Sequence, residues 1–296
     1  MKFPEISIAL TTYNGGRYLR QQIESLMAQT MPFDELIICD DTSTDETQTI
    51  LKEYTDKDSR VKVHYNTDNL GFKANFAKAL NLCTGNFIAL CDQDDLWLPN
   101  HIETLYNNIG DRLLVCGDAE LIDRQGNRIN QRLSKIKNFN KKGDDCKSIF
   151  RFIAYYQNPF QGASMMMRRE FLNIALPIPT SVKYHDVWFA HLACAMNKFI
   201  YIDKPITMYR MHGDNASGNH AHKNHWRSIL GHIVKKNLGN NRKEVIDAIE
   251  NKIGRIDASF RPLIKEATTY YNNNRGYRDR LRNMIFELKN HKSIYG

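Results

Sequence analysis

The sequence predicts an α/β fold in which helices cover both faces of a mixed, mostly parallel sheet, an α/β/α sandwich. Short apolar runs rich in β-branched residues alternate with stretches whose apolar residues recur at helical spacing. The 296 residues are 42% hydrophobic and 25% charged, which excludes a wholly disordered chain and suffices for a large core. No stretch approaches the roughly 18 apolar residues of a membrane span.

The first 95 residues alternate between strand and helix. Strands are expected at four short apolar runs, residues 6–11, 36–39, 61–65 and 87–91. Helices are expected between them, at residues 17–29, around 50–54, and at 72–82. Ser43 or Thr44 is expected to cap the second helix, because either side chain can accept hydrogen bonds from the first N–H groups of a helix. This order is typical of βαβ units, so we expect the four strands to form a parallel sheet.

The pattern is looser between residues 96 and 220. Strands are expected at 113–116 and 199–202, with a short apolar segment at 163–167. Residues 123–147 are polar and are expected to form a mobile loop.

A helical region is expected to follow a body that spans residues 1–220. Residues 221–296 contain three apolar stripes at helical spacing, at 226–234, 245–256 and 281–288, with Lys and Arg on the opposite faces. We therefore expect a C-terminal helical extension.

The excess positive charge of the chain lies in this C-terminal region. The net charge is +8, yet residues 1–220 carry 25 Lys and Arg against 26 Asp and Glu, whereas residues 221–296 carry 16 against 7. The asymmetry predicts an anionic partner for the region, either a nucleic acid or an acidic membrane surface. The alternative is a plain helical extension that packs on the body or on a second copy of the chain, as in a homo-oligomer.

The cysteines and the N-terminus indicate the compartment. Six cysteines are scattered without the spacing of a zinc site, and several lie in apolar runs, as buried free thiols do. The first residues lack the apolar run of a signal peptide. We therefore expect a reducing, cytoplasmic compartment.

Polar clusters follow three of the four predicted strands, at the sheet edge where α/β proteins bind ligands. Asp92, Asp94 and Asp95 repel one another unless a cation such as Mg²⁺ or Mn²⁺ neutralises them; the alternative is a solvated acidic turn. Asp41 can accept a hydrogen bond from a base N–H or a ribose hydroxyl, or it can belong to a helix cap. Tyr13 can stack on a flat base, or it can be a half-buried aromatic residue.

Two later residues can also take part in chemistry. Asp186 can act as a general base if a hydroxyl lies within reach, or it can cap a helix that starts at Val187. His212 can contact a metal ion or a phosphate, or it can be an ordinary surface residue in a turn.

Six motifs occur in order over residues 5–218. They are Thr11-Thr12-Tyr13-Asn14, Asp40-Asp41-Thr42-Ser43-Thr44-Asp45, Asn69-Leu70-Gly71 with Asn75-Phe76, Asp92-Gln93-Asp94-Asp95-Leu96-Trp97, His185-Asp186-Val187-Trp188, and Tyr209-Arg210-Met211-His212-Gly213-Asp214-Asn215. Together they resemble the inverting family 2 glycosyltransferases, and the last two are similar to the branch that includes bacterial rhamnosyltransferases.

The resemblance implies a GT-A fold, in which a Rossmann-like nucleotide-binding half, residues 1–98, joins an acceptor half, residues 99–220. It implies the following roles: nucleoside binding by Thr11, Tyr13 and Asp41; contact with the ribose or the metal shell by Asp92; binding of Mg²⁺ or Mn²⁺ by Asp94 and His212; catalytic base, Asp186; and acceptor side, Gly162, Ala163 and Trp188.

The implied activity is metal-dependent transfer of a sugar from a nucleotide donor, dTDP-rhamnose or a UDP-sugar. The acceptor would be a hydroxyl of a polysaccharide, or of a glycan linked to polyprenyl diphosphate, in bacterial cell-surface synthesis. The enzyme would then be peripheral on the inner face of the plasma membrane, where each basic residue near the anionic leaflet contributes about 1 kcal/mol. The alternatives are nucleotide-sugar binding without turnover and nucleic-acid binding through residues 221–296; no nucleic-acid-binding motif occurs, so no nucleic-acid partner is expected.

Overall fold

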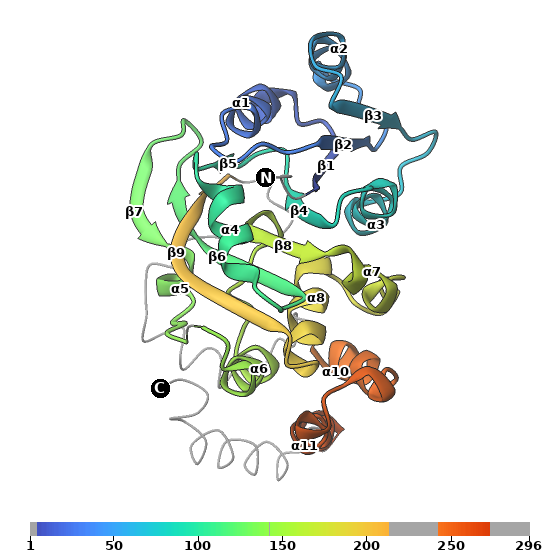
Figure 1. Cartoon of the computed structure of the whole chain (residues 1–296), viewed down its shortest axis with the longest axis vertical. Helices are drawn as coiled ribbons and strands as arrows, with labels where there is room; N and C mark the ends of the chain where they lie inside the picture. The colour runs from blue at the N-terminus through green and yellow to red at the C-terminus, as the bar shows by residue number, and fades with distance from the viewer. Residues whose placement is uncertain (1–4, 142, 213–241, 273–296) are drawn as a thin grey trace.

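A computed structural model describes residues 5–141, 143–212 and 242–272 (Figure 1). The strands are β1 (Ile6–Thr12), β2 (Glu35–Asp40), β3 (Val61–Tyr65), β4 (Phe87–Cys91), β5 (Leu96–Trp97), β6 (Leu114–Ile122), β7 (Arg128–Arg132), β8 (Met165–Arg168) and β9 (Phe199–Arg210). The α-helices are α1 (Gly16–Met27), α2 (Thr47–Lys57), α3 (Phe72–Leu82), α4 (His101–Ile109), α5 (Leu133–Ile136), α6 (Cys146–Tyr155), α7 (Arg169–Ala175), α8 (His185–Ala195), α10 (Arg242–Glu250) and α11 (Arg261–Asn272). Three short 3₁₀ turns are η1 (Gly162–Ser164), η2 (Ile253–Arg255) and η3 (Ala258–Phe260).

The strands of the described residues form one mixed sheet with the order β3-β2-β1-β4-β8-β6-β9-β5, and β7 pairs with β6. Strands β1 to β4 are parallel to one another, whereas β8 runs antiparallel to both of its neighbours. The register sets Thr12 of β1 opposite Asp40 of β2, so the carboxyl ends of these strands lie level with each other. The polar residues that follow the two strands therefore meet at one edge of the sheet.

Each face of the sheet has its own hydrophobic core. Alternate side chains of β1 point to opposite faces, as expected for a strand. Ile6, Ile8 and Leu10 pack with α1, α2 and α4 in one core. Ala9 belongs to the other core, which contains residues of α3, α6, α7 and α8. The predicted sandwich, with a mixed sheet between two helical layers, is confirmed.

Residues 123–147 are more regular than the sequence analysis expected. They contain β7, α5 and the start of α6 rather than one loop. The buried carboxylate of Asp118 explains part of this order, since it accepts hydrogen bonds from Arg132 Nε at 2.6 Å and from Ser134 Oγ at 2.7 Å. Polar residues of this segment therefore belong to a hydrogen-bond network that holds it in place. Composition alone predicts a loop, because it counts the residues as polar without showing their partners.

The predicted cap of the second helix is wrong. Helix α2 begins at Thr47, with Glu46 before it, so neither Ser43 nor Thr44 caps it. Instead, the backbone N–H of Asn14 donates to Ser43 Oγ at 2.9 Å, and the N–H of Thr44 donates to the Asn14 side chain at 2.8 Å. Both residues fasten the loop after β2 to the loop after β1.

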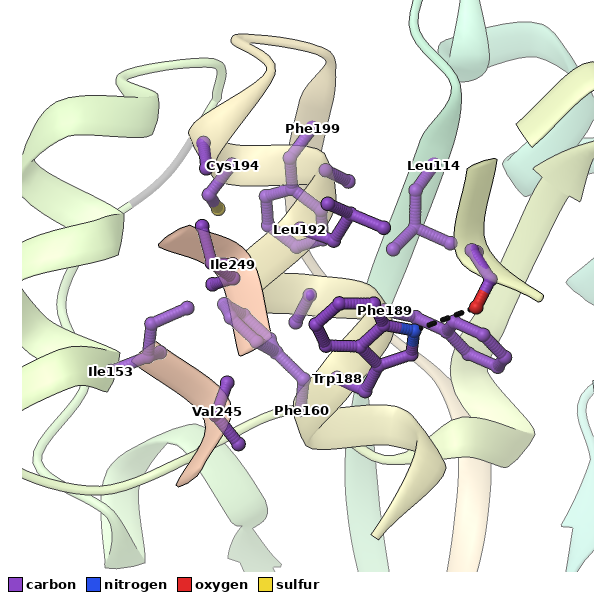
Figure 2. Packing of buried hydrophobic residues seen from close by; sticks show 14 of the residues in the cluster. Leu114, Ile153, Phe160, Trp188, Phe189, Leu192, Cys194, Phe199, Val245 and Ile249 are labelled. Atoms are coloured by element: carbon purple, nitrogen blue, oxygen red, sulfur yellow. Dashed lines mark hydrogen bonds between the residues drawn. The ribbon is translucent and has the colours of Figure 1, made fainter. Parts of the chain in front are cut away.

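Helices α10 and α11 pack on the body of the molecule, at the lower end of Figure 1. Figure 2 shows Val245 and Ile249 of α10 beside Ile153 of α6 and Trp188 of α8. The N–H of Asp257 donates to the carbonyl of Ala195, which adds a backbone hydrogen bond to this contact. Residues 242–272 therefore pack on the body of the protein, which is one of the two alternatives expected for the C-terminal region.

Several expectations for the C-terminal region lie outside the described residues, namely the boundary at residue 220 and the stripes at 226–234 and 281–288. The predicted stripe at 245–256 is not one helix: α10 ends at Glu250, and Ile253 is exposed. All six cysteines are buried free thiols, whereas the sequence analysis expected this of several of them. Over the described ranges, every helix is too short or too polar to cross a bilayer.

Candidate active site

A cavity of about 550 Å³ runs along the carboxyl ends of β1, β2 and β4 and reaches the start of α8. Seven of the predicted site residues line it: Thr11, Tyr13, Asp41, Asp92, Asp94, Gly162 and Asp186. Ala163, Trp188 and His212 are not among its lining residues. The structure therefore brings the nucleotide-side residues and the predicted base together in one hollow, although Asp41 and Asp186 lie far apart in sequence.

The turn after β1 presents Tyr13 to the cavity through a contact with Gln93. The side-chain oxygen of Gln93 accepts from the Tyr13 N–H at 2.8 Å, and its nitrogen donates to the Tyr13 carbonyl at 3.1 Å. A Cβ on Gly15 would lie 2.1 Å from that oxygen, so a larger residue there would displace the Gln93 side chain from its contact with Tyr13. The Tyr13 ring is 52% exposed and is free to stack on a planar ligand.

Asp41 organises the loop that follows β3. Its Oδ1 accepts from Asn66 Nδ2 and from the Leu70 N–H, at 2.7 and 2.8 Å, and its Oδ2 accepts from the Gly71 N–H at 2.8 Å. A carboxylate offers about four lone-pair directions, so one on Oδ2 stays available to a ligand N–H. Gly71 has φ +76°, a conformation that favours glycine.

The acidic cluster after β4 is held in place by the end of β9. The N–H of Arg210 donates to Asp95 Oδ1 at 2.9 Å, and its Nε donates to the carbonyl of Asp94 at 2.8 Å. Asp95 is buried, also accepts from Gln161, and its pKa is raised well above 3.8 by burial and by its acidic neighbours. Asp95 is thus a structural anchor.

Asp92 and Asp94 both line the cavity, and the charge of Asp94 acts on Asp92. Burial, followed by the charges of Asp94 and Asp186, raises the pKa of the Asp92 carboxyl to about 8. His212 Nε2 lies 2.8 Å from Asp94 Oδ2, and the His212 side chain is only 7% exposed. His212 is therefore not the ordinary surface histidine of the alternative reading.

These side chains fit a divalent cation that takes some of its ligands from the protein and the rest from a bound donor. Over the described residues, no three His, Cys, Asp or Glu side chains gather closely enough to hold an ion by themselves. However, Mg²⁺ is commonly held by one or two carboxylates together with substrate phosphates and waters. Asp94 with Asp92 supplies such a carboxylate set, and the raised pKa of Asp92 marks the negative charge that a cation would neutralise.

Asp186 lies in the first turn of α8, beside the opening residues of η1. Burial raises the pKa of its carboxyl to about 6, although the Val187 N–H and the charge of Lys137 both favour the ionised form. The neighbouring His185 is buried against Phe76, with ring centroids 4.2 Å apart. A Cβ on Gly162 would lie 2.9 Å from His185 Nε2, so the absence of a side chain there lets the start of α8 approach the loop.

The predicted acceptor-side residues Ala163 and Trp188 occupy the interior. Trp188 is fully buried in the core and donates from Nε1 to the carbonyl of Ala175 at 2.8 Å (Figure 2). Ala163 is also fully buried, and its carbonyl accepts from Thr207 Oγ1 at 3.2 Å. Neither residue lines the cavity, so the expected acceptor-side role is not supported for either of them.

Sequence reasoning gave no role to Gln93 or Arg210, which position the cavity wall. Both residues lie inside recognised motifs. However, neither a Gln between two acidic residues nor an Arg within an apolar strand forms a sequence pattern that predicts a role in holding a loop in place. It also passed over Lys137 and Arg242, which line the far end of the cavity. These two come from polar stretches in which many basic residues look alike.

Comparison with known proteins places this chain in a family. A sequence model of glycosyl transferase family 2 matches residues 7–176. EpsH of Bacillus subtilis, named as a glycosyltransferase, is 28% identical over 219 residues, which make up 72% of this chain and 62% of that protein. TuaG of the same organism, named for teichuronic acid biosynthesis, is 36% identical over 100 residues, or 34% of this chain and 40% of TuaG.

Solved structures share the fold across most of the chain. The S. aureus TarS fragment 1–349 in complex with UDP-GlcNAc has a TM-score of 0.59 at 19% identity, covering 92% of this chain and 93% of that one. The mannosyltransferase PcManGT from Pyrobaculum calidifontis, in complex with GDP-Man and Mn²⁺, has a TM-score of 0.58 at 17% identity, covering 98% and 76%. These likenesses confirm the GT-A fold, and with the match over more than half of its length the chain belongs to glycosyl transferase family 2.

Proposed function

We propose that this chain transfers a sugar from a nucleoside diphosphate donor to a hydroxyl of a glycan acceptor, with inversion at the anomeric carbon. The observation that carries the proposal is that Asp186 lines the same cavity as Tyr13, Asp41 and Asp94. A direct displacement needs donor and acceptor side by side, and a shared cavity supplies the positioning that makes such a reaction effectively unimolecular.

Asp186 is the proposed general base. A base works best when its pKa lies near the working pH, and burial brings the pKa of this carboxyl to about 6. The acceptor oxygen would form the new bond to the anomeric carbon while its proton passes to Asp186. The bond between that carbon and the diphosphate oxygen breaks on the opposite face, so one displacement inverts the configuration. No covalent intermediate is needed.

The donor would occupy the end of the cavity that runs along the carboxyl ends of the parallel strands β1, β2 and β4. Tyr13 would stack on the base, Asp41 would accept a base N–H at its available lone pair, and Thr11 would complete the nucleoside site. Asp92 would contact the ribose or the metal shell, and Asp94 with His212 would hold Mg²⁺ or Mn²⁺. Such an ion supplies a Lewis acid that stabilises the negative charge of the leaving diphosphate.

The donor would be dTDP-rhamnose or a UDP-sugar, and the product a cell-surface polysaccharide or its lipid-linked precursor. The name of TuaG supports the polysaccharide assignment, and the TarS complex supports a uridine nucleotide. The rhamnosyl specificity rests on the motifs around Asp186 and His212.

We further propose that basic residues of the C-terminal region hold the enzyme at an anionic membrane surface. Most of that region lies outside the described residues. Nucleic-acid binding is less favoured, because Tyr270 and Tyr271, the aromatic pair in the basic stretch, are buried in the core and cannot stack on bases.

Thermal shift measurements with dTDP-rhamnose, UDP-GlcNAc, UDP and GDP-mannose, each with and without Mn²⁺, test donor binding, since a ligand stabilises the state that it binds. The preferred donor should raise the melting temperature only with the ion present.

With that donor, Asp186→Asn should keep binding while transfer falls by about 10²-fold or more. The matched control is Asp68→Asn, an exposed carboxylate outside the cavity. Near-normal transfer by Asp186→Asn would remove Asp186 as the base.

A further inference from the structure

Lys73, the second residue of α3, holds the loop that leads to Asp186. Its ammonium donates to the carbonyls of Val182 at 2.7 Å, Thr180 at 2.9 Å and Pro179 at 3.3 Å. A lysine ammonium has three N–H donors, so these three carbonyls use all of them. Asp186 follows Val182 by four residues. The roles proposed above do not include Lys73.

The loop between α7 and α8 is anchored only in part by burial. It covers residues 176–184, all of which the structure describes, and no helix or strand occurs in it. Of its side chains, Ile178 and Val182 are buried. Four others are exposed, namely Pro177, Thr180, Ser181 and Lys183. The position of the loop therefore depends strongly on polar contacts such as those from Lys73.

The first turn of α8, which contains Asp186, depends on the same surroundings. Its N-cap residue is Tyr184, a residue type without the short side-chain oxygen by which Ser, Thr, Asp or Asn caps a helix. Asp186 Oδ1 accepts from the Val187 N–H at 2.7 Å, which is a contact within the turn itself. Further along α8, residues such as Trp188 are fully buried in the core. The first turn is therefore the part of α8 that neighbouring elements must hold.

The start of α3 supplies those neighbours. The centroid of the Phe72 ring lies 5.9 Å from that of Tyr184 and 6.4 Å from that of His185. Phe76, about one turn further along α3, has its ring centroid 4.2 Å from that of His185. Lys73 lies between these two phenylalanines in the sequence and holds the preceding loop. Helix α3 thus contacts both the loop and the first turn of α8.

Helix α3 is itself fixed to the carboxyl end of β2. Asn75 is buried, and its Nδ2 donates to the carbonyl of Cys39 at 2.8 Å. Its Oδ1 accepts from Asn66 Nδ2 at 2.9 Å, and the same nitrogen donates to Asp41 at 2.7 Å. Lys73 therefore projects from a helix that is held firmly to the sheet, and a side chain on such an element can fix a loop precisely.

We propose that Lys73 is a positioning residue for sugar transfer. By holding the carbonyls of Pro179, Thr180 and Val182, it keeps the Asp186 carboxylate where it can take the proton of the acceptor hydroxyl. The inference rests on the proposed function, because it needs Asp186 to be the base. Lys73 is not among the residues that line the cavity, so it acts through the loop and touches no substrate. A misplacement of about 1 Å can lower a rate by about 10²-fold.

Hydrogen exchange of the full chain, followed by mass spectrometry, tests the tether without any ligand. Lys73→Met removes the ammonium and keeps an unbranched stem. It should speed exchange by about tenfold or more in peptides that cover residues 182–190 and leave peptides of α2 unchanged. The matched control is Lys52→Met, because Lys52 is exposed on α2, pairs with Asp56 at 3.0 Å and lies outside the cavity. Wild-type exchange of residues 182–190 in Lys73→Met would overturn the proposal.

Turnover tests the consequence for the base. It is measured as hydrolysis of the nucleotide sugar that gives the largest thermal shift with Mn²⁺, since water can take the place of the acceptor hydroxyl. Lys73→Met should lower kcat by about tenfold or more and leave the affinity for that donor unchanged, which also shows that the variant is folded. In the Asp186→Asn background the same change should have no further effect, because the carboxylate that it positions is absent. An equal loss in both backgrounds would indicate a merely structural role and overturn the proposal.

The outcomes separate the positioning role from the proposed function. Wild-type turnover by Lys73→Met together with defective turnover by Asp186→Asn overturns the positioning role alone. Near-normal turnover by Asp186→Asn, or failure of the wild type to bind any nucleotide sugar, overturns the proposed function and the positioning role with it. Where hydrolysis is too slow to follow, the exchange of residues 182–190 decides whether Lys73 holds the segment that contains Asp186.

Discussion

Replacing Asp186 by asparagine should stabilise the folded protein while it abolishes transfer. Folding raises the pKa of this carboxyl from 3.8 to about 6, because burial disfavours its charge. The folded state therefore binds more protons than the unfolded state between these two values, so stability falls as pH rises through this window. Above pH 6 the penalty is fully present and amounts to about 3 kcal/mol. Asparagine has the same shape and no charge, and its side-chain oxygen can still accept from the Val187 N–H.

Urea unfolding at pH 8 and at pH 4 measures the effect. At pH 8 the free energy of unfolding of Asp186→Asn should exceed that of the wild type by about 1–3 kcal/mol, and the difference should shrink towards zero at pH 4. The exposed control Asp68→Asn should stay within about 0.5 kcal/mol of the wild type at both values. Equal stability at pH 8, or a difference that does not depend on pH, would refute the claim that folding buries a charge at this position.

Three further changes follow from the geometry. Asp94→Ala should remove the dependence of donor binding on Mn²⁺; a wild-type donor affinity that is the same with and without the ion would contradict the metal assignment. Gly162→Ala places a Cβ 2.9 Å from His185 Nε2, so the free energy of unfolding should fall by about 1–3 kcal/mol, and an unchanged urea midpoint would contradict this contact. Ending the chain at residue 241 removes fully buried side chains such as Val245 and Phe260, each worth about 1.5–3 kcal/mol, so the truncated protein should aggregate or lose cooperative unfolding; a soluble, cooperatively folded product would show that the extension is dispensable.

The sheet and the gathering of polar residues at its edge were predictable from the sequence for one physical reason. In a parallel sheet the strands end at a common edge, so residues that directly follow strands meet in space whatever their distance in sequence. Tyr13, Asp41 and Asp92 each come within one residue of the end of a strand. Locating the strands was therefore enough to gather these residues, and the motif order then indicated the family.

Other residues that line the cavity follow no such rule, and two of them bear on how the charge of the chain is understood. Lys137 and Arg242 come from a short helix end and a docked extension, about a hundred residues apart, and no periodicity relates them. A charge count assigns Arg242 to a basic C-terminal region with an external partner, yet this residue lines the cavity that contains Asp186. The apolar stripe of α10 places it there, since Val245 and Ile249 dock against α6 and α8. At least one of the basic residues in this region thus belongs to the wall of the candidate active site, so a charge count alone does not assign it to an external partner.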